Sequence, residues 1–362
     1  MNKYKVCVYA ISKNERVNVN KWYNSMKEAD EIYVLDTGST DGTVEELKKL
    51  GVHVEEKIIN PWRFDVARNI SLHLVPNDCD ICVCTDLDET FEPNWRIELE
   101  KIWSTDITRV NYIYNWSFIN DKPATIFYLN KIHSRNDYKW SHPVHEVLKN
   151  INNNEKQIYT NNIILNHNQI PKNSRSNYLK LLELSVKEDP LDDRNMHYLG
   201  REYMYYKKWN KSIDTLIKHL NLKTSIWKDE RCASMRYISR CYIALKRYNE
   251  AIMWLEKAIN ESPYLREGYY ELGYLLYSLG EYRESKKILL KSLKIKDRSK
   301  SYLNEYYCWD GSIEDMISIC EFNLGHLKNS INYMKKSLKI NPNNERVKNN
   351  IKIVKNIIKN NK

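Results

Sequence analysis

The sequence has no run that approaches the ~18 uninterrupted apolar residues of a membrane-spanning helix. Hydrophobic residues make up 42% and charged residues 29% of its 362 positions, a composition typical of a soluble globular protein of about two domains. The first apolar run, residues 6–11, is short, and Ser12-Lys13-Asn14-Glu15 follows it where a secretory leader would have a small-residue cleavage site. We therefore expect a cytoplasmic protein that begins with a β-strand.

Paired CxxC spacings are lacking too, although the chain has eight cysteines. The one cluster, Cys79, Cys82 and Cys84, lies in an apolar run, and alternating side chains of a strand face opposite sides. A structural zinc site takes its ligands from paired cysteines in loops. We expect buried, reduced thiols here rather than a zinc site.

Acidic residues are few in the C-terminal tail, which accounts for much of the formal net charge of +10. Residues 343–362 contain five lysines, Arg346 and only Glu345 as an acid, so this tail carries half of the excess. Elsewhere no basic surface interleaved with aromatic residues stands out. A nucleic-acid partner is therefore not expected.

The first half of the chain alternates short β-rich runs with polar helical stretches, which is the pattern of a parallel α/β sheet. Later aromatic and β-branched runs are typical of an antiparallel extension of that sheet. The expected strands are residues 5–11, 31–35, 52–56, 80–85, 110–118, 124–129 and 163–165, and the expected helices are residues 18–29, 43–50, 65–74 and 95–103.

From about residue 174 the pattern is almost entirely helical and repeats itself. Taking Gly200, Ser239, Gly273 and Ser318 as equivalent gives separations of 39, 34 and 45 residues. The middle value is the tetratricopeptide period, and the others imply inserts. Residues 174–342 thus resemble tetratricopeptide repeats, with a plain helical bundle as the alternative, and residues 343–362 are predicted to form a basic capping helix.

Stacked helical pairs present concave surfaces that bind peptides or protein subunits. The repeats therefore suggest a protein or peptide partner or a homodimer built through them, the alternative being that they only stabilise the fold. On the tail, Val347, Ile351, Val354 and Ile358 share one helical stripe opposite the lysines. A capping role explains this stripe, and at most it implies peripheral contact with an anionic membrane surface.

Chemistry is expected where the strands end, because ligands of open α/β sheets bind beyond the carboxyl ends of the strands. Three such ends are polar: Ser12-Lys13-Asn14-Glu15, Asp36-Thr37-Gly38-Ser39-Thr40-Asp41-Gly42-Thr43, and Asp86-Leu87-Asp88-Glu89. No P-loop or GxGxxG accompanies them. Carboxylates so placed suit a divalent cation that in turn holds phosphates.

These motifs, in this order, resemble the GT-A fold of family 2 glycosyltransferases, which use nucleotide-activated sugars. The segment from Trp62 to Asn69 resembles the Arg-Asn helix of that family. His142-Pro143-Val144-His145-Glu146, Asn166-His167-Asn168 and the fused repeats resemble peptide glycosyltransferases of the sublancin S-glycosyltransferase type. The resemblance implies an α/β, Rossmann-like nucleotide-sugar-binding domain over residues 1–170.

The resemblance also implies roles for single residues. Asp36 would accept from the base edge of a uridine nucleotide, although capping of the next helix by Asp41 or Thr40 is an alternative use of that loop. Asp88, completed by His167, would ligate Mg²⁺ or Mn²⁺. The residues implied to contact the UDP-sugar are Ser12, Asn14, Glu15, Asp36, Asp65, Arg68, Asn69, Asp86 and Leu87.

An inverting transfer needs a carboxylate that removes the acceptor proton. Glu146 is chosen over Glu89 and Asp137, because it stands where the acceptor-side motif of the family occurs. Trp116 and Trp140 could stack on sugar rings, although strand aromatics usually belong to the core.

Together these features predict a metal-dependent inverting glycosyltransferase. It would transfer a hexose or N-acetylhexosamine from a UDP-sugar to a Ser, Thr or Cys side chain of a protein or peptide. The alternatives are an enzyme acting on a lipid-linked or cell-surface glycan, and a repeat-based adaptor with a vestigial catalytic half.

Overall fold

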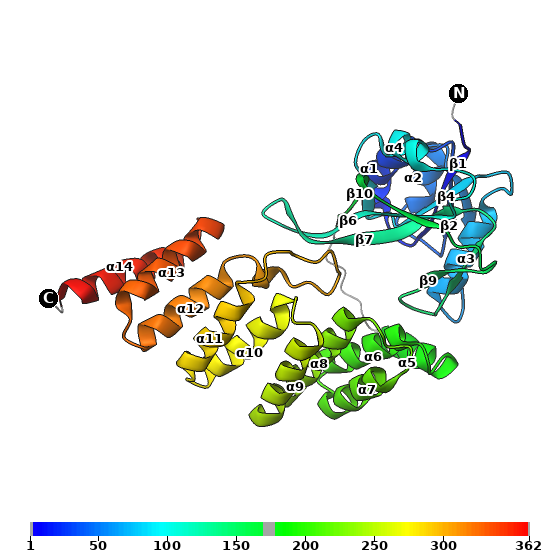
Figure 1. Ribbon diagram of the computed structural model, residues 1–362. Helices are drawn as coiled ribbons and strands as arrows, with labels where there is room; N and C mark the ends of the chain where they lie inside the picture. The colour runs from blue at the N-terminus through cyan, green and yellow to red at the C-terminus, as the bar shows by residue number, and fades with distance from the viewer. Residues whose placement is uncertain (1–2, 169–177, 361–362) are drawn as a thin grey trace. The chain divides into compact units, whose positions relative to one another are not determined.

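The computed structural model describes residues 3–168 and 178–360, and the chain divides into two compact units, Met1–Glu188 and Asp189–Lys362 (Figure 1). The domain limits predicted at residues 170 and 174 lie outside the described residues. Each unit is described by itself.

The first unit is built on an eight-stranded mixed sheet with the strand order β3-β2-β1-β4-β7-β6-β10-β5. Strands β3, β2, β1 and β4 are parallel, and β7 runs antiparallel to both of its neighbours. The predicted parallel sheet with an antiparallel extension is therefore present, although β10 pairs parallel to β6. The elements are β1 (Val6–Ser12), α1 (Arg16–Met26), β2 (Glu31–Asp36), α2 (Thr43–Lys49), β3 (His53–Glu56), α3 (Phe64–Leu74), β4 (Ile81–Thr85), β5 (Glu89–Phe91), α4 (Trp95–Ile102), β6 (Arg109–Ile119), β7 (Lys122–Ser134), β8 (Tyr138–Ser141), β9 (Val147–Asn150), β10 (Gln157–His167) and α5 (Tyr178–Glu188).

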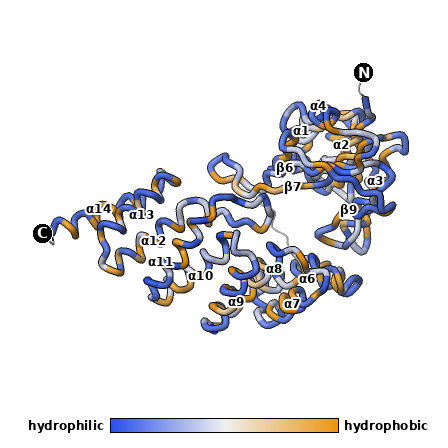
Figure 2. The backbone as a smooth tube through the Cα atoms, in the orientation of Figure 1, coloured by the Kyte–Doolittle hydropathy of each residue, from blue (hydrophilic) through white to orange (hydrophobic). Residues whose placement is uncertain are grey.

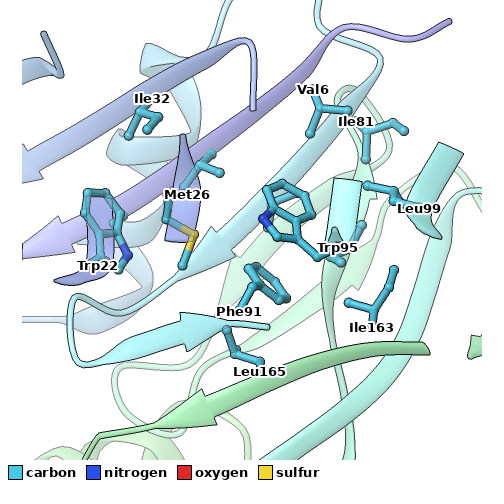
Figure 3. Close-up of a cluster of buried hydrophobic side chains, with 14 of the residues drawn as sticks. Val6, Trp22, Met26, Ile32, Ile81, Phe91, Trp95, Leu99, Ile163 and Leu165 are labelled. Carbon is cyan, nitrogen blue, oxygen red and sulfur yellow. The ribbon is translucent and has the colours of Figure 1, made fainter. Parts of the chain in front are cut away.

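Apolar side chains of α1 and α4 cover one face of the sheet. Trp22, Met26, Trp95 and Leu99 are at most 1% exposed and lie against strand residues such as Leu165 (Figure 3). Both indoles also satisfy their N–H groups, Trp22 to the Thr85 hydroxyl at 3.0 Å and Trp95 to the Ser25 carbonyl at 2.9 Å. These large buried rings fix α1 beside the ends of β1 and β4, where the polar segments begin.

The other face of the sheet is covered by α3 and by the small β8–β9 sheet. Cys7, Cys82 and Cys84 belong to this second cluster, together with Leu72 and Trp140. All eight cysteines are buried and free, as expected for reduced thiols in a core.

The second unit consists of helices, most of them joined by short turns and α11 joined to α12 by the longer segment 293–311, and each helix contacts the next along the chain. In Figure 2, hydrophilic and hydrophobic segments alternate along these helices, as expected of helices that bury one side. The helix α14 packs its Val347 and Val354 against α13, which agrees with the predicted capping role. The helices are α6 (Asp193–Tyr205), α7 (Trp209–Asn221), α8 (Lys228–Ala244), α9 (Tyr248–Glu261), α10 (Arg266–Ser278), α11 (Tyr282–Ser292), α12 (Ser312–Asn323), α13 (Leu327–Ile340) and α14 (Glu345–Asn360), with a 3-10 turn η1 (Tyr306–Cys308).

Small residues recur in this unit because paired helices approach closely at them. Ser212 donates to the Gly200 carbonyl and Ser285 donates to the Gly273 carbonyl, each at 2.7 Å. The first contact joins α6 to α7 and the second joins α10 to α11, so the same arrangement occurs in two helix pairs. The predicted equivalence of Gly200 and Gly273 is thereby confirmed.

Replacing Gly273 by alanine should destabilise the second unit. The added Cβ would lie 2.5 Å from Leu289 Cδ2, and Leu289 is fully buried. Overpacking of this kind costs about 1–3 kcal/mol, against a gain of about 1 kcal/mol in helix propensity.

Gly268→Ala in the same helix is the matched control, because its Cβ would lie 3.1 Å from Ile259 Cγ1, and its other neighbours, at 3.5 and 3.7 Å, are at ordinary van der Waals distance. Urea unfolding followed by circular dichroism should give a lower free energy of unfolding for Gly273→Ala than for Gly268→Ala. Equal values would contradict the close approach.

Candidate functional site

Three polar strand ends meet at one edge of the first unit's sheet. Ser12 and Asp36 are register partners at the ends of β1 and β2, and Ala10 of β1 pairs with Thr85 at the end of β4. Because these strands are parallel neighbours, the segments that follow them emerge side by side. The structure therefore brings the three predicted segments together.

The Asp36 carboxylate organises the loop that follows β2. Its Oδ1 accepts from the backbone N–H groups of Gly38 (3.0 Å) and Ser39 (2.7 Å), and its Oδ2 accepts from the hydroxyls of Ser12 (2.7 Å) and Ser39 (2.5 Å). A carboxylate has about four acceptor positions. A nucleotide base that contacted Asp36 would therefore have to displace one of these bonds.

Asn14 joins the first polar segment to the second. It has a positive φ of 56°, its N–H donates to the Ser39 hydroxyl at 2.8 Å, and its side-chain oxygen accepts from the Thr40 N–H at 2.8 Å. Asp41 also accepts from the N–H of Thr43, the first residue of α2, at 3.0 Å, although the N-cap position itself is Gly42. Glu15 is 9% exposed and accepts from Asn18 at 2.7 Å.

Arg68 of α3 connects two residues that the sequence assigned to different roles. Its side chain is 3% exposed and lies 2.5 Å from Asp86 Oδ1 and 3.1 Å from Glu146 Oε1. Burial by itself would lower the pKa of Arg68, but the negative charges around it, Asp86 foremost, outweigh burial and raise that pKa. The guanidinium therefore remains charged. It links Glu146, the predicted base, to Asp86, the first residue of the Asp86-Leu87-Asp88 motif.

Sequence reasoning missed Lys131, which β7 brings to the same place. Its Nζ lies 3.3 Å from Asp86 Oδ2 and 3.8 Å from Glu89 Oε1. Burial would raise the pKa of Asp86, but Arg68 and Lys131 outweigh it, so that the pKa of this carboxyl lies below its usual range. A single lysine in a long strand carries no motif, and only the pairing of β4 with β7 places it here.

Glu89 faces the protein interior. It is 2% exposed, accepts from the Tyr114 hydroxyl at 2.6 Å and from the Asp86 N–H at 2.9 Å, and burial raises its pKa. These contacts fix the turn that carries Asp86 and Asp88.

Asp88, one of the predicted metal ligands, lies beside His167, the other. Asp88 Oδ2 and His167 Nε2 are 3.5 Å apart, and their side chains are 18% and 11% exposed. His167 also stacks on the half-exposed ring of Trp116 with ring centroids 4.3 Å apart. A carboxylate oxygen and an imidazole nitrogen at this separation can both reach one divalent cation at the usual bond lengths of about 2.0–2.2 Å.

Three of the residues predicted to contact the UDP-sugar have side chains that contact other parts of the protein. Asn69 exchanges two hydrogen bonds of 2.9 Å with the backbone of Trp140, Asp65 pairs with Arg63 at 2.9 Å, and Leu87 is 2% exposed in the core. Their observed contacts position α3, β8 and the β4 turn.

A second group of metal-ligating side chains lies in the second unit. Within residues 3–168 and 178–360, Asp193, His219 and Glu230 form the one set of at least three such residues whose ligand atoms all lie within 4.8 Å of one another. His219 Nε2 already lies 3.3 Å from Glu230 Oε1 and 3.0 Å from the Ser225 hydroxyl. These contacts join α7 to α8.

Replacing Arg68 by methionine should weaken the first unit, because Asp86 and Glu146 would lose the cation between them. Removing one partner of a buried ion pair costs about 3–5 kcal/mol, and the partial exposure of Asp86 (36%) favours the lower end. At about 2–4 °C per kcal/mol, the thermal midpoint of the first unit should fall by about 6–12 °C.

Lys48→Met is the control, because Lys48 pairs with Glu56 at the exposed surface. Differential scanning calorimetry of both variants would decide. If the thermal midpoint of Arg68→Met equalled that of Lys48→Met, the stabilising role of the buried ion pairs of Arg68 would be contradicted.

Comparison with known proteins agrees with this geometry. Residues 7–165 match Glycosyl transferase family 2, and residues 238–264, 267–299 and 316–344 match the tetratricopeptide repeat. The first unit is therefore a domain of the family 2 glycosyltransferase type, followed by a helical region of tetratricopeptide repeats. The predicted fold class is confirmed.

The curated relatives are glycosyltransferases without an assigned role. An uncharacterized glycosyltransferase of Rickettsia conorii is 34% identical over 103 residues, covering 28% of this chain and 35% of the relative. One from Rickettsia prowazekii is 32% identical over 103 residues, covering 28% and 34%. The chain thus spans about a third of the length of the curated relatives that it matches.

Solved structures align less well. MamA is 20% identical with a TM-score of 0.38, covering 46% of this chain and 89% of MamA. A thermophilic TPR protein of Thermus thermophilus is 19% identical with a TM-score of 0.35, covering 49% and 88%. TM-scores of that size establish no common fold. Among the described residues, no helix has both the length and the apolar character needed to cross a bilayer.

Proposed function

We propose that the chain is a metal-dependent inverting glycosyltransferase that transfers a hexose or N-acetylhexosamine from a UDP-sugar to a Ser, Thr or Cys side chain of a protein or peptide. The observation that carries the proposal is the meeting of Asp88, His167, Asp86, Arg68 and Glu146 at one sheet edge of a family 2 type domain.

Asp88 and His167 are the residues that would hold Mn²⁺ or Mg²⁺. Such an ion would neutralise charge that develops on the leaving nucleoside diphosphate. Asp86 is held on both oxygens by Arg68 and Lys131, which suits contact with the ribose or with a bound water better than direct ligation. Trp116, stacked on His167 and half-exposed, offers a flat apolar surface next to the metal ligands.

Glu146 is the proposed base. Its side chain is 13% exposed, and Arg68 keeps its position through one oxygen, Oε1. In the proposed reaction the Glu146 carboxylate takes the proton of the acceptor hydroxyl or thiol, while the acceptor oxygen or sulfur forms its bond to the anomeric carbon as the bond to the diphosphate breaks.

The tetratricopeptide repeats support a protein or peptide acceptor, because stacked helical pairs mostly bind peptides or protein subunits. Likeness to the sublancin type, a homodimer through the repeats and a cytoplasmic location are part of the same proposal.

Isothermal titration of the full chain with a panel of nucleoside diphosphate sugars, with and without Mn²⁺, tests the donor half of the proposal. One UDP-sugar should bind with micromolar affinity only when the metal is present. If none of the nucleoside diphosphate sugars bound, the proposed activity would be contradicted and a repeat-based adaptor would be favoured. A search for glycosylated peptide by mass spectrometry, using the donor so identified, tests the acceptor half.

A further inference from the structure

The long third repeat separation reflects an insert, residues 293–311, between α11 and α12. The helices α6, α8, α10 and α12 are the first members of successive pairs, and neighbours in this row contact one another. In Figure 1 the insert runs as an irregular segment beside α10. Its side chains and carbonyls contact α6, α8 and α10, so it lies along this first-helix row.

Side chains of the insert contact side chains of α8 and α6. The Tyr302 hydroxyl donates to Glu230 Oε2 at 2.8 Å, and the Tyr302 ring stacks on Tyr198 of α6 with centroids 6.1 Å apart. Arg240 donates to Glu305 Oε1 at 3.2 Å and to the Tyr307 hydroxyl at 3.1 Å.

The helices also contact the backbone of the insert, which folds here into a turn at residues 302–303 and the 3-10 helix η1. Arg236 of α8 donates to the Leu303 carbonyl at 3.3 Å, and the Glu305 N–H donates to Glu267 Oε1 of α10 at 3.0 Å. Arg266 of α10 donates to the Cys308 carbonyl at 3.0 Å. Leu303 is 6% exposed and belongs to the same apolar cluster as Met204 and Tyr237.

Besides their contacts with the insert, the two central arginines are held by a carboxylate of a neighbouring helix. Glu271 of α10 accepts from Arg236 at 2.8 Å and from Arg240 at 2.7 Å. This ion pair between α8 and α10 orients the Arg236 guanidinium, which is 2% exposed with the insert in place. A surface whose donors are already placed loses little entropy when it binds a ligand.

We propose that residues 299–309 are an intramolecular ligand of the first-helix row, and that this row binds peptides which carry Tyr, Glu and Tyr at the spacing of Tyr302, Glu305 and Tyr307 and which adopt the same turn and 3-10 conformation. A tethered segment acts at an effective concentration of about millimolar. A peptide with the same contacts and a micromolar Kd is therefore excluded from the row until the insert is released.

The probe is a fluorescent peptide of residues 297–310 that carries Cys308→Ser, and the receptor is the full chain. In the first variant, residues 299–309 are replaced by a Gly/Ser linker of equal length. The second is Glu305→Lys, which places a cation against Arg236 and Arg240. Glu284→Lys is the control, because Glu284 is exposed on α11 and pairs with Lys287.

Fluorescence anisotropy should show the peptide binding to the linker variant at least about 10-fold more tightly than to the wild type and the control. The same peptide with Glu305→Lys should not bind. Hydrogen exchange of the insert amides should be about 10-fold faster in the Glu305→Lys chain. This variant also covers the case in which the linker variant fails to fold, because it leaves Leu303 and Cys308 in place.

Three outcomes would overturn the proposal: a linker variant with native circular dichroism that does not bind the peptide, equal binding by the wild type, or unchanged exchange in the Glu305→Lys chain. No sugar donor or metal enters these experiments. Their failure is therefore distinguishable from failure of the proposed transferase activity.

Discussion

Replacing Asp88 by asparagine is expected to lower the rate of metal-dependent sugar transfer by at least about 100-fold, because the amide removes the negative charge that pairs with the cation. Loss of one electrostatic stabiliser of developing charge typically costs about 10²–10³ in rate. The fold should persist, because Asn is isosteric and the Asp88 carbonyl, not its carboxylate, accepts the Asn168 N–H.

Initial rates against Mn²⁺ concentration would measure this effect once a donor is identified. Asp78→Asn makes the same chemical change before β4 begins, at a side chain that is 72% exposed and pairs with Lys5, and should leave the rate unchanged. If the Asp88→Asn enzyme kept the metal dependence and rate of the wild type, Asp88 would not be a metal ligand.

Replacing Glu146 by glutamine should lower kcat by about 10²–10⁴-fold, the usual contribution of a general base, while donor affinity stays within about threefold of the wild type. The amide oxygen of glutamine can still accept from Arg68, so the loop geometry is retained. A combination of lost turnover and retained donor binding is specific to a base, because a residue that binds the donor would change both.

The other two carboxylates supply the controls. Glu89 is 2% exposed and already accepts from Tyr114, and Asp137 accepts from Asn152 and Asn154 at 2.9 Å each, contacts that join the loops around β8 and β9. Asp137→Asn should therefore keep kcat. If Glu146→Gln retains full turnover while Glu89→Gln loses it, the base is Glu89 instead.

Much of the site could be predicted because strand ends are visible in the sequence. Asp36 and Asp88 each follow an apolar run, and parallel strands deliver their carboxyl ends to a common edge. The proximity of His167 to Asp88 followed only from a resemblance, since 79 residues separate them. Local patterns contain no information about which distant strands pair.

Asn69 and Arg68 show the same limit, because the sequence did not predict which residues their side chains contact. Asn69 lies on the predicted helix, yet its amide holds the Trp140 backbone. Arg68 is predicted to contact the UDP-sugar, and the contact that the sequence did not predict is its buried link between Asp86 and Glu146. Helix periodicity predicts which face is buried, whereas the partner of a polar group depends on what packs against that face.

The sequence alone determined the two-part architecture of this protein, the repeat period and the acidic strand ends, because these depend on patterns between near neighbours. Only the tertiary structure decided that Lys131 faces Asp86, that Ser12 of β1 donates to Asp36, and that residues 293–311 lie on the first-helix row. Those contacts join residues far apart in the chain, where burial and charge pairing, not local propensity, select the partner.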